Sequence, residues 1–115
     1  MSGGMDKDRI RRDFARAVNM SADELADWLA TEASRRVGLR RPGASESIGH
    51  ASGRRIVSIL EASATELDDE DYAHMRKVVG YVHRHKALRP ANIYTSRWRY
   101  SLMNWGHDPV KEDEN

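Results

Sequence analysis

The hydrophobic residues of this 115-residue chain recur at intervals of three and four along most of its length, the spacing of one face of an α-helix. No stretch of useful length alternates hydrophobic and polar residues as a half-buried strand does. The pattern therefore predicts an all-α single domain of about five helices with short connections. The five expected stripes are Ile10, Phe14, Ala17 and Val18; Leu25, Trp28 and Leu29; Ile48, Ile56, Ile59 and Leu60; Tyr72, Met75, Val79 and Val82; and Trp98, Leu102 and Trp105.

The clearest helix start lies at Ser21. Ser21 and Glu24 have the spacing of a capping box, in which the serine side chain accepts from the glutamate backbone and the glutamate side chain accepts from the serine backbone. Met20 and Leu25 flank it as a hydrophobic staple. We expect this second helix to run without a break to about residues 35–38.

Helix boundaries are also predicted in the second half of the chain. Asp68 is a suitable N-cap for a helix that runs to about Lys86, and Thr95 is one for the last helix. Gly106 suits the left-handed position after a helix, and Pro109 prevents that helix from continuing.

The expected domain organisation is a flexible N-terminus over residues 1–5, a helical domain over 6–107 and an acidic disordered tail over 108–115. One internal loop, residues 38–47, contains two glycines, a proline and two arginines. It is either a mobile basic loop or a plain linker.

The third helix begins unusually, with Gly49, Ser52 and Gly53 on one face. Small residues at this spacing allow a close neighbour, which is either another helix or a phosphate at the helix N-terminus. Arg54 and Arg55 follow directly and keep the second interpretation open. The spacing differs from that of a P-loop.

Composition excludes several classes of protein. The chain has no cysteine, which rules out disulfides, thiolate zinc sites and thiol nucleophiles. No apolar run approaches the roughly 20 residues needed to span a bilayer, and the N-terminus lacks an apolar signal segment. We therefore expect a soluble, cytoplasmic protein without a membrane partner. The net charge of +1 combines −2 over residues 1–34, +6 over 35–99 and −3 over 100–115, so a basic middle lies between acidic ends.

Catalytic and metal chemistry have little support. His83 and His85 are two residues apart and diverge on a helix, and the other histidines lie in separate elements. No serine lies in a G-x-S-x-G elbow. We expect no catalytic residues, no metal site and no cofactor, and thus a protein that is not an enzyme.

Basic and aromatic residues instead favour a phosphate-binding surface, because arginine and lysine neutralise phosphates and tyrosine stacks or hydrogen-bonds beside them. The leading hypothesis is a DNA-binding helical module that acts mainly through phosphate contacts. The alternative is a protein-interaction domain that uses the same surface for an acidic partner or a second copy of the chain. The candidate contact residues are Arg54, Arg55, Lys77, Tyr81, Arg84, Arg97 and Arg99.

Four runs of sequence resemble a known family: FARAVNMSADELADWLATEASRRVG, SIGHASGRRIVSIL, DDEDYAHMRKVVGYVHRH and TSRWRYSLMNWGHDP. It is a family of small bacterial and fungal proteins, domain-of-unknown-function family 3140, and the likeness spans about Arg9 to Lys111. Its members are sometimes labelled DNA-binding. The resemblance thus favours DNA as the partner, and it implies no catalytic or ligand residues.

Overall fold

The computed structural model describes residues 6–114. Over this range the chain is all-α and contains no strand, as predicted. It has seven α-helices where about five were expected, and the expected flexible residues 1–5 lie outside the described range. The elements are α1 (Lys7–Ala17), α2 (Ala22–Leu29), α3 (Glu32–Arg36), α4 (Ile48–Glu61), the 3-10 helix η1 (Ala64–Glu66), α5 (Asp69–Lys86), α6 (Arg97–Asn104) and α7 (Pro109–Asp113).

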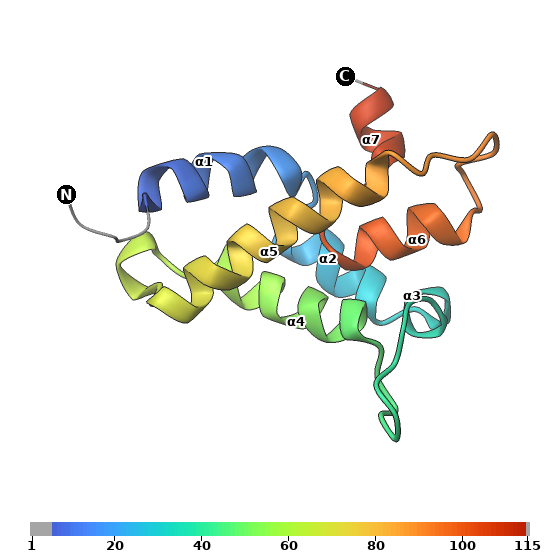
Figure 1. The fold of residues 1–115 in the computed structure, drawn as a ribbon, viewed down its shortest axis with the longest axis horizontal. Helices are drawn as coiled ribbons and strands as arrows, with labels where there is room; N and C mark the ends of the chain where they lie inside the picture. Colours follow the sequence, from blue (N-terminus) through green and yellow to red (C-terminus); the bar gives the residue numbers. More distant parts are fainter. Residues whose placement is uncertain (1–5, 115) are drawn as a thin grey trace.

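The longest helix, α5, crosses the molecule diagonally in Figure 1, with α1 along one side and α4 along the other. The helix α2 packs on α4 behind α5, and α6 contacts α2, α3, α4, α5 and α7. The stretch around α6 is therefore the common neighbour of most other helices. No helix in the described part of the chain is long and apolar enough to cross a membrane.

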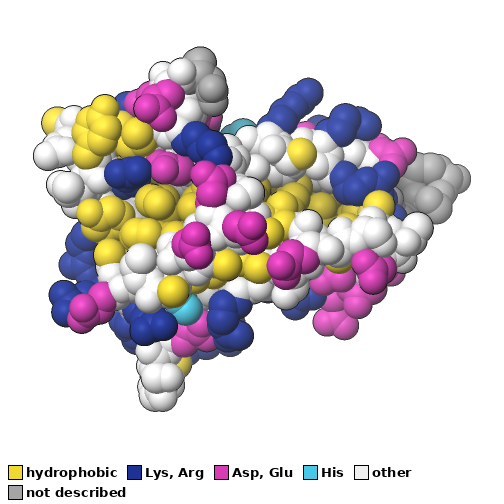
Figure 2. All heavy atoms as spheres, turned by 180° about the vertical axis from the view of Figure 1, so that it is seen from behind, with side chains coloured by type: hydrophobic (Ala, Val, Ile, Leu, Met, Phe, Trp, Pro, Cys, Tyr) yellow, Lys and Arg dark blue, Asp and Glu magenta, His cyan; other side chains and the backbone are white. Residues whose placement is uncertain are grey.

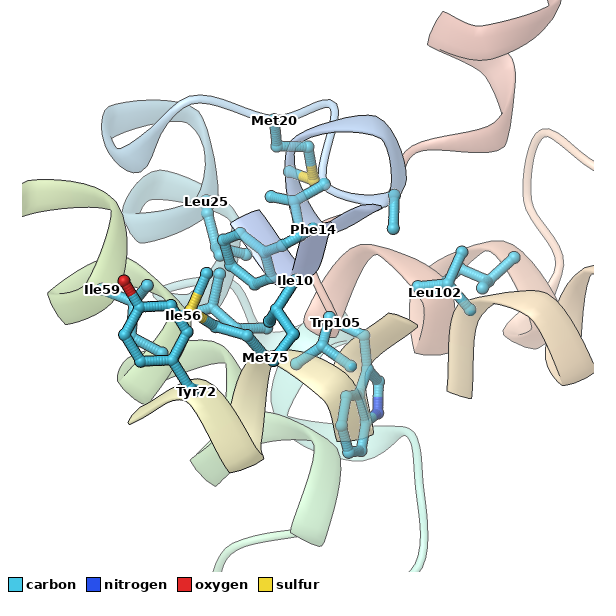
Figure 3. Close-up of a cluster of buried hydrophobic side chains, with 14 of the residues drawn as sticks. Ile10, Phe14, Met20, Leu25, Ile56, Ile59, Tyr72, Met75, Leu102 and Trp105 are labelled. Atoms are coloured by element: carbon cyan, nitrogen blue, oxygen red, sulfur yellow. The ribbon is translucent and has the colours of Figure 1, made fainter. Parts of the chain in front are cut away.

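The core is one continuous cluster of side chains from α1, α2, α4, α5 and α6 (Figure 3). The predicted stripes supply most of it, including Phe14, Leu25 and Leu102. On α5 the structure buries Val78 and leaves Val79 half-buried, whereas the sequence pattern placed Val79 in the stripe. Both positions satisfy helical spacing, so the packing of α5 against its neighbours decides which one faces inward.

The capping predictions for the first half hold, with one correction. Ser21 and Glu24 form the capping box, with backbone-to-side-chain distances of 2.8 and 3.1 Å. The expected helix from Ser21 to about residue 35 is broken, because Thr31 caps a new helix and accepts from the backbone N–H of Ser34 at 3.2 Å. The Thr31 hydroxyl also donates to the carbonyl of Trp28 at 2.7 Å, which closes α2.

The second half shows two further differences from expectation. Asp68 caps α5 and Gly106 has a φ of +82°, both as predicted. The N-cap of α6 is Ser96 and not Thr95; its hydroxyl accepts from the backbone N–H of Arg99 at 3.1 Å.

The tail that was expected to be disordered forms α7. Asp108 caps it, and Pro109 occupies the first turn, where its missing N–H costs nothing. Two of its carboxylates pair with cations near the end of α5: Glu112 with Lys86 at 2.7 Å and Asp113 with Arg89 at 2.5 Å.

Candidate anion-binding cleft

A cleft of about 650 Å³ lies between α5, α6, the first turn of α4 and the loop that precedes it. We call it the α4–α5–α6 cleft. Four cations line it, and none of its lining residues is an aspartate or glutamate. Its lining residues that bear on binding are Leu39, Arg41, Gly49, Lys77, Tyr81, Arg84, His85, Arg97 and Trp105.

The four cations of the cleft are Arg41, Lys77, Arg84 and Arg97. None of them forms an ion pair with a carboxylate among the described residues. Four like charges around one concavity without counter-charge raise the local positive potential and attract anions.

Four aromatic rings form a stack that runs from the neighbouring hollow, where His74 lies, into the cleft. Trp105 lies between His74 and Tyr81, at centroid distances of 6.2 and 4.2 Å, and Tyr81 also stacks on His85 at 5.0 Å. Both faces of Tyr81 are therefore covered by protein rings. Tyr81 offers a ligand its edge, not a free face for stacking, and ring edges carry partial positive charge; its hydroxyl already interacts with Ser101.

Trp105 differs from the other two tryptophans in its hydrogen bonding. The indole N–H of Trp28 donates to Asn104 at 2.8 Å, and that of Trp98 donates to the carbonyl of His85 at 2.6 Å. The indole N–H of Trp105 has no acceptor among the described residues, although the residue is only 4% exposed. In Figure 3 its nitrogen lies on the side of the ring turned away from Met75.

A second donor lies beside this indole, in the first turn of α4. The N–H of Ile48 donates to the carbonyl of Leu39 at 2.8 Å, and that of His50 donates to the hydroxyl of Ser47 at 3.0 Å. The N–H of Gly49 between them has no acceptor within the described range. A Cβ placed on Gly49 would lie 2.9 Å from the indole nitrogen of Trp105, so the absence of a side chain here brings the two residues together.

A neighbouring hollow continues the positive region along α5 and α4. It shares Arg41, Lys77 and Trp105 with the cleft and adds Arg55 and His74. Burial, together with the nearby charges of Arg55 and Lys77, lowers the pKa of His74 to about 4. The imidazole accepts or donates a hydrogen bond at 2.9 Å to the hydroxyl of Ser52.

Of the residues predicted from the sequence, the structure brings four into the cleft: Lys77, Tyr81, Arg84 and Arg97. These four belong to two helices. Arg41, one of the two arginines of the loop over residues 38–47, was not among the candidate contact residues, and it joins them at the cleft.

The other three predicted residues lie outside the cleft, each with a protein partner. Arg55, in the neighbouring hollow, pairs with Asp71 at 3.2 Å. Arg54 forms a bidentate pair with Glu46 at 2.6 and 2.8 Å, and this contact, with a smaller one from a histidine, lowers the pKa of Glu46 to about 2.

The third, Arg99, bonds both carboxylate oxygens of Asp108 at 3.1 Å and the carbonyl of Tyr94 at 2.8 Å. Its guanidinium thereby connects α6 to the start of α7.

Sequence reasoning assigned Trp105 to the core and did not identify its indole N–H. The glycine face of α4 was the signal that pointed here. At Gly53 the close neighbour is a helix, since an added Cβ would lie 2.6 Å from the carbonyl oxygen of Asn104. At Gly49 the neighbour is the Trp105 indole at the cleft floor.

No curated protein and no solved structure matches this chain. Residues 13–103 match the family described as protein of unknown function (DUF3140), which is most of the chain. The protein is therefore a member of the DUF3140 family.

Proposed function

We propose that this protein is a non-enzymatic, cytoplasmic module that binds DNA, mainly through phosphate groups, at the α4–α5–α6 cleft and the surface around it. One observation carries the proposal: Arg41, Lys77, Arg84 and Arg97 converge on one concavity whose lining contains no carboxylate. Some other surface cations, such as Arg36 and Lys86, form ion pairs, and others, such as Arg12 on α1, have no ion-pair partner among the described residues but do not line this concavity.

The chemistry of these side chains favours phosphate contacts over base reading. Each neutralised phosphate releases condensed counterions, which drives binding to any sequence. The cleft offers cations and N–H donors, and its one amide side chain, Asn104, is committed to hydrogen bonds within the protein. Little sequence preference is therefore expected.

The distribution of charge would orient the protein on DNA. Figure 2 shows the face behind that of Figure 1, where a band of hydrophobic side chains crosses the molecule, with acidic side chains along it and basic side chains around it. The helix α2, which lies behind α5, contributes exposed Asp23, Glu24 and Asp27. That face carries both signs of charge, whereas the cleft lining has cations and no carboxylate, so a polyanion is attracted to the cleft.

The test is a salt titration of duplex DNA binding by fluorescence anisotropy. The double variant Lys77→Ala/Arg84→Ala should weaken binding to unrelated sequences alike. It should also flatten the log–log salt slope by about two units, since each phosphate contact contributes about 0.9. The matched control is Arg12→Ala/Arg16→Ala on α1, which removes the same charge from exposed positions outside the cleft. Its log–log salt slope should stay close to that of the native protein.

Two outcomes would count against the proposal. Equal effects of the two double variants would mean that net charge, and not the cleft, governs binding. Absence of binding at about 50 mM salt would reject DNA as the partner. It would favour an acidic protein partner on the same surface, a function consistent with Leu39, which is 81% exposed at the cleft rim and suits an apolar interface contact.

A further inference from the structure

We propose that the floor of the α4–α5–α6 cleft is a specific site for a phosphomonoester, with Gly49 and Trp105 as its hydrogen-bond donors. The phosphate would belong to the end of a nucleic-acid strand or to a free nucleotide. The inference deepens the proposed function and rests on it for the choice of a nucleotide as the ligand. The donor geometry supports an anion independently.

The first support is the indole of Trp105. The residue as a whole is only 4% exposed, and its N–H has no acceptor among the described residues. The nitrogen is not one of the fully buried atoms without a partner, so the N–H is open to the space beside the ring, and the ring lines the cleft. An open indole N–H is a donor available to a ligand. An acceptor atom of a ligand in the cleft would satisfy it.

The second support is the N-terminus of α4. This helix is 14 residues long, so its first turn carries the positive end of a helix dipole. The N–H of Gly49 has no acceptor in the described part of the chain, and a Cβ added to Gly49 would lie 2.9 Å from the indole nitrogen of Trp105, so the two residues are adjacent. Two adjacent N–H groups at a helix start favour an anion.

The charge and shape of the cleft favour a phosphomonoester in particular. A phosphomonoester carries a charge of about −1.5 to −2 near neutral pH. It is therefore attracted more strongly to four uncompensated cations than a singly charged carboxylate is. A monoester also has one substituent and three terminal oxygens, so it fits into a concavity from one side. A phosphate inside a strand has two substituents and stays at the rim with Arg41, Lys77, Arg84 and Arg97.

The experiment is a ¹H–¹⁵N NMR titration of the whole protein, which observes both donors directly. The titrants are inorganic phosphate, deoxyadenosine 5′-monophosphate, and one single-stranded oligonucleotide with and without a 5′-phosphate. The indole signal of Trp105 and the amide signal of Gly49 should move downfield with every titrant that carries a phosphomonoester or free phosphate. The indole signals of Trp28 and Trp98, which already donate within the protein, are internal references.

The 5′-phosphate should tighten oligonucleotide binding about tenfold or more, the worth of a hydrogen bond to a charged group. Trp105→Phe keeps a ring in the stack and removes the N–H, so it should abolish this gain. Gly49→Ala should do the same by placing a Cβ 2.9 Å from the indole nitrogen. Ser58→Ala, at an exposed position of α4 outside the cleft, is the control that should retain the gain. Unphosphorylated DNA should bind all variants alike at the rim, which also shows that they fold.

The outcomes separate this site from the proposed function. If DNA binds without moving the Trp105 and Gly49 signals, and the 5′-phosphate adds nothing, the phosphomonoester site is wrong and DNA binding stands. If the mononucleotide moves both signals while no oligonucleotide binds, the site is right and the proposed function is wrong. If the phosphorylated oligonucleotide binds more tightly than the mononucleotide, the bound phosphate belongs to the end of a strand. If the two bind with equal affinity, the ligand is the free nucleotide. Equal shifts with glutamate or an acidic peptide would overturn the choice of phosphate.

Discussion

Asn104 and Ser34 hydrogen-bond to each other twice in the buried interior. The Ser34 hydroxyl donates to Asn104 Oδ1 at 2.5 Å, and Asn104 Nδ2 donates to the Ser34 carbonyl at 3.0 Å. The indole N–H of Trp28 donates to the same Oδ1 at 2.8 Å. One amide side chain at the end of α6, next in the chain to Trp105, thereby joins α2 and α3.

Replacing Asn104 by alanine should therefore be costly. It would leave polar groups of Ser34 and Trp28 without partners in the interior, and each such group costs about 1–3 kcal/mol, so we expect a loss of about 3 kcal/mol or more in the free energy of unfolding. The milder Trp28→Phe removes one donor and should cost about 1 kcal/mol. Urea denaturation measures both. A loss below about 1 kcal/mol for the alanine variant would contradict the role assigned to Asn104.

Two helical glycines should respond oppositely to alanine. In Gly53→Ala the new Cβ would lie 2.6 Å from the backbone oxygen of Asn104 and 2.7 Å from Leu29, so a helix would have to move. Such overpacking costs about 1–3 kcal/mol.

The matched variant is Gly80→Ala. Its Cβ would lie 3.0 Å from the end of the flexible Arg84 side chain, which is free to shift, and alanine favours the helix by about 0.5–1 kcal/mol. Thermal denaturation should show Gly53→Ala melting below the native protein and Gly80→Ala at or above it. A melting temperature for Gly53→Ala at or above that of the native protein would mean that α4 and α6 are not in close contact at Gly53.

The free energy of unfolding should fall as the pH is lowered, over a range of pH that the protonation of His74 determines. Its pKa is about 4 in the folded protein, against 6.5 ordinarily, mainly through burial. Between these pH values the unfolded chain holds a proton that the folded protein lacks, so lowering the pH favours unfolding. The stabilisation is complete above about pH 6.5 and lost towards pH 4. Glu46, with a pKa of about 2, contributes only at lower pH.

We therefore expect His74→Gln to reduce the loss of stability between about pH 7 and about pH 5, measured by urea denaturation. Part of the loss should remain, because burial also lowers the pKa of His85. His83→Gln, on the exposed side of the same helix, is the control. An unchanged pH dependence in His74→Gln would show that folding does not lower the pKa of His74.

The features predicted correctly from the sequence depend on residues within a few positions of one another. The capping box of Ser21 and Glu24 and the left-handed Gly106 follow from local backbone geometry. The hydrophobic stripes likewise follow from a helical period of 3.6 residues. Such features need no knowledge of how the helices pack, so the sequence determined the helical class and most of the core.

The cleft depended on tertiary structure, because its properties arise from residues far apart in the chain. Arg54 and Arg84 look alike in the sequence, yet only the fold shows that Arg54 meets Glu46 while Arg84 faces a cleft without carboxylates. Trp105 enters the α5 ring stack from α6, which puts its indole N–H beside Gly49 of α4. Charge pairing and ring stacking require two groups within a few ångströms, and only the packing of α4, α5 and α6 sets those distances.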